Sequence, residues 1–336
     1  MKTNQSSLVV ATVLTVFVCA CSSNSNQMTM TTQALEVQII LAGTGTATVD
    51  WGNGTIKETL TLSEEGEEYN YTYVDNSTRR ITITGNNITG LGCANNELTD
   101  LDVRRNTELR GLLCDENQLK TLDVSKNIKL ELLHCSNNQL TSLNVDRHTA
   151  LSELLCYENQ LKTLDVSKCI ALYDLRCNDN LLTTLTTGRN TALKVFDCSY
   201  NQLTALAMNG CTSLRWIDCS HNQLAILDII DNAVLEWLAC NYNHLAALDV
   251  SRNTLLENLF CLDNHLTTLD LRSNAALQRL MCGSNQLQDS ALNSLFDTLH
   301  NNTVSNKVLY IVGNPGTNTC DKAIAERKGW TVQIYN

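Results

Sequence analysis

Ten cysteines follow one another at intervals of 21 residues. They are Cys93, Cys114, Cys135, Cys156, Cys177, Cys198, Cys219, Cys240, Cys261 and Cys282. Such a row could bind a metal ion or form disulfides, but metal sites need ligands that converge, and side chains in a row about 4.8 Å apart keep their Cβ atoms too distant for a bridge. We therefore expect buried, reduced thiols that act as small apolar side chains, with no metal and no cofactor. Cys169 and Cys211 lie two repeats apart, too far for a bridge, and Cys320 has no obvious partner.

Two carboxylates raise the question of acid–base catalysis. Asp197 and Asp218 lie 21 residues apart, so stacked repeats would bring their carboxyl groups to about 5 Å, a separation that retaining glycosidases use. His221 follows closely. An open strand surface has no pocket that excludes water, and tuning a pKa or stabilising a transition state needs one, so we expect a solvated acidic row and no enzyme. His244 and His265 could bind a metal weakly, or they simply continue a row of glutamines.

All these residues belong to one repeat, L-x-x-L-x-C-x-x-N-x-L-x-x-L-D-x-S-x-N-x-x, whose ten copies begin at positions from Ile88 to Leu277. One copy cannot cover its own apolar side, so neighbouring copies must stack. The alternation around each cysteine predicts one short strand per repeat in a parallel sheet. The asparagine at the ninth position, from Asn96 to Asn285, would satisfy backbone groups buried where the chain turns. Each repeat is too short for a full helix on its outer side, where we expect turns, short 3₁₀ pieces or extended chain.

Aromatic residues make up only 5% of the chain, yet several fall at repeat positions that face solvent. The candidate ligand-binding residues are Tyr157, Asp197, Tyr200, Trp216, Asp218, His221, Trp237, Tyr242 and Phe260. Trp216 and Trp237 share one position in adjacent repeats, so their rings should lie about 5 Å apart, and His221 should lie between Tyr200 and Tyr242. Exposed aromatics suit hot spots of protein interfaces or stacking surfaces for sugars; the alternative is that they only shield the sheet. The aspartates would give this face a negative field that favours cationic partners.

The first twenty residues, 1–20, predict a signal peptide. Lys2 precedes an apolar run over residues 8–20, which is too short to span a bilayer as a helix. The run ends in Val18-Cys19-Ala20-Cys21, which resembles the bacterial lipobox, and the resemblance implies cleavage before Cys21 and lipidation of that cysteine. The alternative is an ordinary secretory signal with incidental cysteines. Residues 21–33 would then form a lipidated, flexible tether.

The repeats, residues 88–288, are expected to lie between two caps that cover the ends of their core. Residues 34–87 alternate with the period of β-strands, and the W-G-N-G turn at Trp51 looks like that of a PKD-like sandwich, which predicts a β-rich N-terminal cap. Residues 289–336 combine helical and strand-like spacing and predict an α/β C-terminal cap.

The repeats and the chain's ending together resemble internalin-like bacterial leucine-rich-repeat proteins. The match is best to lipoproteins of the Bacteroidetes type, which have 21-residue L-x-x-L-x-C-x-x-N repeats and an N-P-G…K-G-W tail, here Asn314-Pro315-Gly316 and Lys328-Gly329-Trp330. The resemblance covers Ile88 to Trp330. It implies a leucine-rich-repeat solenoid, with a parallel β-sheet and a turn or 3₁₀ outer side, in a recognition protein of the cell envelope, usually at the cell surface.

Three functions remain open at this point. The first is an outer-membrane lipoprotein, anchored through Cys21, whose strand face binds a protein on a host cell or another microbe. The second is a glycan-binding surface protein that uses the aromatic row, and the third is a structural spacer of the envelope. The formal net charge of −11 argues against nucleic acid as a partner, because such binding depends on neutralising phosphates.

Overall fold

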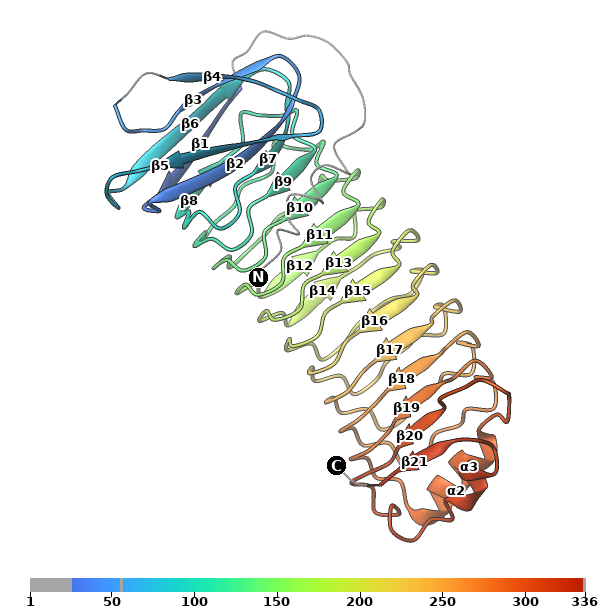
Figure 1. Ribbon diagram of the computed structural model, residues 1–336. Coiled ribbons are helices and arrows are strands. Elements are labelled where there is room, and N and C mark those ends of the chain that lie inside the picture. Colours follow the sequence, from blue (N-terminus) through green and yellow to red (C-terminus); the bar gives the residue numbers. More distant parts are fainter. Residues whose placement is uncertain (1–25, 55–56, 335–336) are drawn as a thin grey trace. The chain divides into compact units, whose positions relative to one another are not determined.

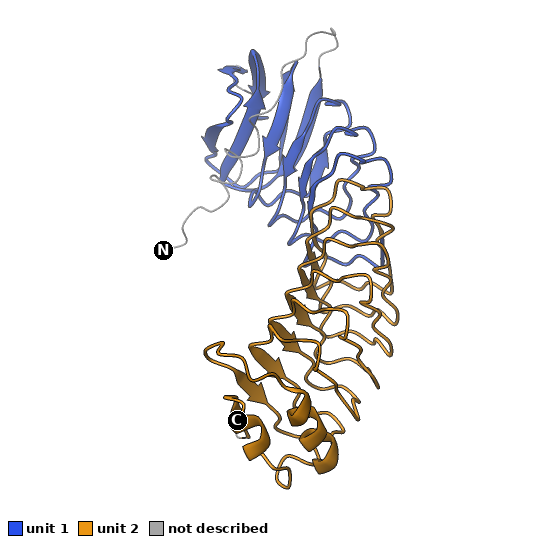
Figure 2. Cartoon of the chain, turned by 90° about the vertical axis from the view of Figure 1, so that its right-hand side faces the viewer, with its two compact units in different colours: residues 1–164 blue, residues 165–336 orange. Residues whose placement is uncertain are grey.

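The computed structural model describes residues 26–54 and 57–334, and this part consists of short strands with two helices near its C-terminal end (Figure 1). The chain divides into two compact units, residues 1–164 and residues 165–336 (Figure 2). The expected signal peptide and Cys21 lie outside the described residues.

The first unit begins with a five-stranded sheet in the order β4-β3-β6-β1-β8. Its strands are β1 (Gln27–Thr32), β3 (Thr46–Asp50), β4 (Glu58–Thr61), β6 (Arg79–Gly85) and β8 (Asp100–Asp102). All neighbours in this sheet pair antiparallel. Alternate side chains of β1 and β6, among them Met28, Met30, Ile81 and Ile83, are fully buried, as a two-residue period on a half-buried sheet requires.

The position of β1 corrects one expectation. Residues 21–33 are expected to be a flexible tether, but the described part of this segment contains β1 in the interior of the sheet, paired with both β6 and β8. The segment looks polar because threonines alternate with Met28 and Met30. Threonine is β-branched and favours strands, and the two methionines supply the buried face.

A second sheet of the first unit runs in the order β5-β2-β7-β9-β10-β11. Its strands are β2 (Glu36–Gly43), β5 (Glu67–Thr72), β7 (Ile88–Gly92), β9 (Gly111–Leu113), β10 (Leu132–His134) and β11 (Glu153–Leu155). Strand β2 pairs antiparallel with β5 and β7, whereas β7, β9, β10 and β11 are parallel. The antiparallel strands of the cap therefore continue directly into the parallel strands of the repeats.

The second unit holds a parallel sheet in the order β13-β15-β16-β17-β18-β19-β20-β21. Its strands are β13 (Asp174–Arg176), β15 (Val195–Asp197), β16 (Trp216–Asp218), β17 (Trp237–Ala239), β18 (Asn258–Phe260), β19 (Arg279–Met281), β20 (Val308–Tyr310) and β21 (Thr331–Gln333). From β13 to β19 the register pairs residues 21 apart, for example Asp197 with Asp218. The expected fold class, a leucine-rich-repeat solenoid, is confirmed in both units.

The remaining elements lie outside these sheets. They are β12 (Thr163–Asp165), β14 (Thr184–Thr186), α2 (Asp289–Thr298) and α3 (Ala323–Glu326). Between β7 and β19 the described chain returns on the outer side through turns and short extended pieces, as a short repeat demands. Helix α2 begins where the repeat pattern ends and buries Leu292, Leu295 and Phe296.

The ten repeat cysteines are completely buried, so the expected burial is confirmed. Like Cys169, Cys211 and Cys320, they form no disulfide within the described residues. Burial is the main reason that the pKa of each affected thiol is raised; for Cys261 it reaches about 12. A thiol in such surroundings stays protonated and behaves as a small apolar side chain.

The asparagines of the ninth position form a second ladder. The side-chain amide of Asn138 donates to the backbone oxygens of Cys114, Cys135 and Ser136 at 3.0–3.2 Å, and its Oδ1 accepts from the N–H of Leu119 at 2.9 Å. The same set recurs at Asn201, Asn222 and Asn243. Each amide thus links two repeats through buried backbone groups that would otherwise lack partners, which confirms the expected role.

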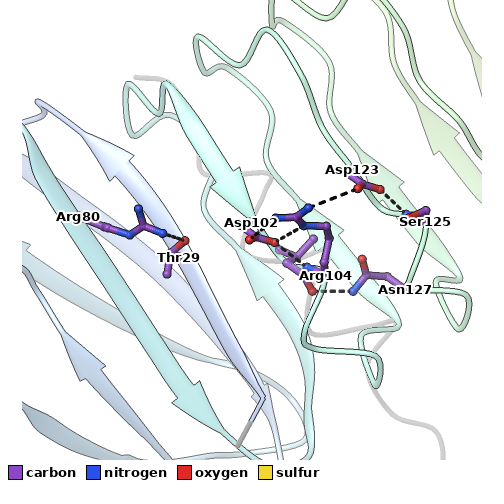
Figure 3. A network of polar contacts seen from close by, with 8 residues as sticks. Thr29, Arg80, Asp102, Arg104, Asp123, Ser125 and Asn127 are labelled. Atoms are coloured by element: carbon purple, nitrogen blue, oxygen red, sulfur yellow. Dashed lines mark hydrogen bonds and ion pairs between the residues drawn. The ribbon is translucent and has the colours of Figure 1, made fainter.

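Aspartates at the fifteenth position close the outer turns. In Figure 3, Asp102 accepts a hydrogen bond from the N–H of Arg104 at 3.1 Å, and Asp123 accepts one from the N–H of Ser125 at 3.0 Å. The Arg104 guanidinium also pairs with Asp102 at 2.8 Å, and its hydrogen bond is the main cause that lowers the pKa of Asp102 to about 2. The aspartates of the fifteenth position are therefore exposed to solvent and also hold the outer turns in their conformation.

Candidate functional site

The strand face of the second unit is formed by β13 and β15 to β19 (Figure 1). These strands and the turns that follow them carry eight of the nine candidate residues, and the backbone register brings them into neighbouring repeats. We use the name aromatic surface for its rings, which are Tyr200, Trp216, His221, Trp237, Tyr242 and Phe260. The ninth candidate, Tyr157, lies in the first unit; it is partly buried, and this burial raises the pKa of its hydroxyl.

Three rings of the aromatic surface form one continuous stack. His221 lies between Tyr200 and Tyr242, with ring centroids 4.0 Å and 4.2 Å apart and planes inclined by 12° and 17°. The two tyrosines remain 52% and 47% exposed, so the stack faces solvent. The expected position of His221 between the two tyrosines is therefore confirmed.

The backbone beneath this stack is left-handed. Tyr200, His221 and Tyr242 have φ values of 51°, 53° and 52°, and the same position is left-handed in every repeat. The N–H of each of the three donates to a backbone oxygen of the next repeat at 2.9–3.0 Å, which holds the conformation in place. Five of the other seven repeats carry asparagine, aspartate or serine there, and two carry Glu116 and Glu158; small polar residues tolerate this conformation better than tyrosine does.

Trp216 and Trp237 do not meet as expected. Their backbones are paired, but the Trp237 ring contacts Phe260, with centroids 4.6 Å apart and planes at 43°, and no ring contact between the two tryptophans occurs in the described chain. Phe260 pairs with Ala239, whose methyl group leaves room for the Trp237 ring to lean toward the following repeat. Backbone pairing thus sets the distance between repeats but not the direction of a large side chain.

Asp197 and Asp218 are backbone neighbours in β15 and β16. Asp197 accepts hydrogen bonds from the N–H and the hydroxyl of Ser199 at 3.0 Å and 2.7 Å, and Asp218 accepts one from the N–H of Ser220 at 2.9 Å. Burial raises the pKa of Asp197, and the nearby charge of Asp218 raises it further, against the lowering effect of its hydrogen bonds. The hydrogen bonds thus hold both side chains in place, and the charges of the two carboxylates repel each other.

Sequence reasoning missed the residues that border these carboxylates. Lys194 lies over the Tyr173 ring at 4.9 Å, and Arg215 is ion-paired with Glu236. These four residues share the second repeat position, just before the strands. In the sequence this position holds one tyrosine, two basic residues and then a glutamate, but which of them pair depends on side-chain directions that the period does not specify.

The arrangement offers no metal centre. Within residues 26–54 and 57–334, no group of three or more histidine, cysteine, aspartate or glutamate side chains could hold a metal ion. The rings of His244 and His265 stack, with their centroids 5.6 Å apart and their planes inclined by 20°. In the same described part, no helix is long and apolar enough to cross a membrane.

No protein-family profile matches the chain, and no curated protein matches it. Among solved structures, the functional domain of InlJ from Listeria monocytogenes, described as including a cysteine ladder, is 32% identical with a TM-score of 0.66 and is matched over 75% of this chain and 55% of that one. This chain thus spans about half the length of that structure.

Two further solved structures show the same fold at lower identity. YopM from Yersinia enterocolitica is 23% identical (TM-score 0.55, 69% of this chain and 47% of that one). A chain of the LRIM1/APL1C complex is 25% identical (TM-score 0.52, 62% and 40%). With its stacked parallel strands and asparagine ladder, the chain is a leucine-rich-repeat solenoid protein whose structural neighbours include an internalin-type protein.

Proposed function

We propose that this protein is a lipid-anchored recognition protein of the bacterial cell envelope that binds a protein partner through the aromatic surface. The observation that carries the proposal is the exposure of Tyr200 and Tyr242 at left-handed backbone positions. A bulky residue in this conformation costs roughly 1–2 kcal/mol relative to its preferred region. Strain of this kind at a solvent-facing site is a reason to infer function.

Protein recognition also agrees with the composition of the surface. Tyrosine and tryptophan dominate the hot spots of protein interfaces, because one ring offers a large contact area at a small entropic cost. Here Tyr200, Trp216, Trp237 and Tyr242 lie in three consecutive repeats of a chain with only 5% aromatic residues. The structural neighbours include a leucine-rich-repeat protein within a complex, which fits a recognition scaffold.

Cross-linking on intact cells tests this proposal. A photoreactive phenylalanine analogue replaces Tyr200 in the full chain, and the control carries it at Ile226, which is 77% exposed and lies off the strand face. We expect a cross-linked protein from the first position only, lost when Trp216→Ala and Trp237→Ala are added. Equal cross-linking from both positions, or none from Tyr200, would contradict a protein partner.

The lipid anchor rests on the sequence around Cys21. An aliphatic residue at Val18 and a small residue at Ala20 precede it, as in the lipobox. We expect Cys21→Ser to release the protein from the membrane fraction and to abolish labelling by a radioactive fatty acid, while Cys19→Ser changes neither. Retained labelling in Cys21→Ser would refute the anchor. Outer-membrane placement and surface exposure, part of the same proposal, are tested by protease accessibility on whole cells.

A glycan ligand is the second candidate, because Trp216 and Trp237 lie in adjacent repeats of one face. A glycan-array signal that the double alanine variant loses, with no cross-linked protein, would favour it. If neither assay responds to the double variant, the protein is better explained as a structural spacer of the envelope.

A further inference from the structure

The two carboxylates beside the aromatic surface lack a counter-ion. Among the described residues, no lysine, arginine or histidine nitrogen lies within 4.0 Å of the carboxylate of Asp197 or Asp218. Arg176 on β13 is the register partner of Asp197, and its charge lowers the pKa of Asp197, but its guanidinium is ion-paired with Asp174 at 3.1 Å. Arg215 is paired with Glu236, and Lys194 lies over the Tyr173 ring. These three cations therefore have other partners, and neither carboxylate of the pair has an ion pair of its own among the described residues.

Aspartates that accept such backbone hydrogen bonds differ in their ion pairing. On the outer turns Asp102 has Arg104 and Asp270 has Arg272 beside it. Asp165, Asp228 and Asp249 accept the same kind of bond there but form no ion pair within the described part of the chain. Asp197 and Asp218 accept the same kind of bond from Ser199 and Ser220 but stand next to one another instead. Two like charges in register on adjacent strands destabilise a sheet.

On the strands that follow β16, the residues in register with Asp218 are apolar. In register, Asp218 is followed by Ala239 and then by Phe260. Ala239 is only 4% exposed, and it lies between Asp218 and Phe260, next to the strand position of Trp237. A carboxylate pair bordered by a small apolar side chain and large rings matches a ligand with a cationic tip and an apolar stem.

We propose that the protein partner of the aromatic surface inserts a cationic side chain, arginine by preference, onto the paired carboxylates of Asp197 and Asp218. This inference rests on the proposed function and names the chemistry of the contact. The arginine stem would lie along the half-buried rings of Trp237 and Phe260, and its planar guanidinium offers several donors that can reach both carboxylates at once. It is also less strongly hydrated than an ammonium group and stacks on aromatic faces, so it suits a partly buried site flanked by Trp216.

Selection from a displayed library of random peptides of about twelve residues tests the inference without a known partner. The full chain is the target, and peptides that also bind the Trp216→Ala, Trp237→Ala variant are removed. We expect the selected peptides to share an arginine. In a synthetic copy, citrulline in place of that arginine, which keeps the shape and removes the charge, should weaken binding about tenfold or more.

Two protein variants give the reciprocal test. Asp197→Asn and Asp218→Asn keep an acceptor for Ser199 and Ser220, and each should weaken binding of the arginine peptide about tenfold while leaving the citrulline peptide unchanged. Asp249→Asn is the matched control, because Asp249 accepts the same kind of hydrogen bond from Ser251 on an outer turn. Thermal unfolding of all three variants confirms that they are folded.

The outcomes separate this inference from the proposed function. Peptides that require the tryptophans but contain no cation, or that bind Asp197→Asn and Asp218→Asn as well as the wild type, would overturn the arginine contact and leave protein recognition standing. Peptides that bind only outside the aromatic surface, or a selection that yields no binder, would count against both.

Discussion

The ring of Tyr200 stacks on the ring of His221 with centroids 4.0 Å apart, although both residues hold left-handed backbone conformations. Stacking of two aromatic rings contributes about 0.5–1.5 kcal/mol, which is close to the cost of about 1–2 kcal/mol for the backbone conformation of a bulky residue. The stack therefore adds little net stability, and its value lies in the surface that it presents.

This balance leads to the first prediction. In Tyr200→Asn, Tyr242→Asn, the loss of stacking and the relief of backbone strain should offset each other, so the free energy of unfolding should change by less than about 1 kcal/mol. Partner binding should fall by about tenfold or more, because exposed tyrosines are typical hot spots. Urea unfolding and cross-linking from the photoreactive residue, moved to position 216, measure the two effects. A loss of several kcal/mol with binding retained would instead show that the stack serves to shield the sheet.

A second prediction concerns His148, which replaces the usual asparagine at the nineteenth position. It is almost completely buried, its Nε2 lies 3.2 Å from the backbone oxygen of Val124, and its Nδ1 has no partner. Burial lowers the pKa of His148. The unfolded chain therefore binds a proton more readily than the folded one, so the stability is full above about pH 6.5 and falls as the pH drops toward the folded pKa.

His148→Asn should remove this pH dependence. Asparagine can donate to the oxygen of Val124 and to that of Asn127, as Asn127 itself donates to Val103 and Asn106. Urea unfolding at about pH 8 and about pH 5.5 should show a smaller difference for His148→Asn than for the wild type. The control, His265→Gln, changes an exposed histidine and should leave the difference as it is. An unchanged difference in His148→Asn would show that other groups cause the acid sensitivity.

The fold could be predicted from the sequence because one number, the 21-residue period, determines which residues are neighbours in the sheet. The burial of the cysteines, the partners of Asn138 and the order of Tyr200, His221 and Tyr242 all follow from that period together with the alternation of strands. Because the same pattern occurs in ten copies, an ambiguous residue in one copy does not change the predicted fold.

The features that could not be predicted depend on side-chain directions or on weak local signals. The Trp237 ring turns toward Phe260 because Ala239 is small, a three-residue effect that no period contains. Strand β1 was not predicted because its threonines make the segment polar in composition, although Met28 and Met30 are buried. The left-handed position could be inferred only from two asparagines, two aspartates and one serine among its ten residues, and the glutamates, tyrosines and histidine there obscured the pattern.

A third prediction tests the asparagine ladder. The amide of Asn222 donates to the oxygens of Cys198, Cys219 and Ser220 at 2.9–3.3 Å, and its Oδ1 accepts from the N–H of Leu203. Asn222→Leu leaves these buried groups without partners and should lower the free energy of unfolding by about 1–3 kcal/mol. The adjacent Gln223 is exposed, so Gln223→Leu should change it by less than about 0.5 kcal/mol. Equal effects of the two substitutions would mean that the ladder is not what stabilises the turns.

A fourth prediction concerns the reactivity of the cysteine ladder. A thiol reagent attacks the thiolate, and burial both raises the pKa of Cys198, Cys219 and Cys240 and blocks access to their sulfur atoms. In the native protein these cysteines should therefore be labelled only as fast as the solenoid opens, and in urea they should be labelled at once. Mass spectrometry of digested samples, taken at intervals after iodoacetamide is added, follows each site separately.

Cys320 provides an internal comparison, because burial raises the pKa of its thiol as well but leaves the residue 8% exposed, whereas the ladder cysteines are 0% exposed. We expect Cys320 to be labelled before Cys219 if the solenoid opens locally and together with it if the whole chain opens at once. Rapid labelling of the ladder in the native state, or mass evidence of disulfides between sites 21 residues apart, would be incompatible with thiols that point in one row into a closed core. Since the register of that core also places Asp197 next to Asp218, the same result would remove the basis for the arginine contact.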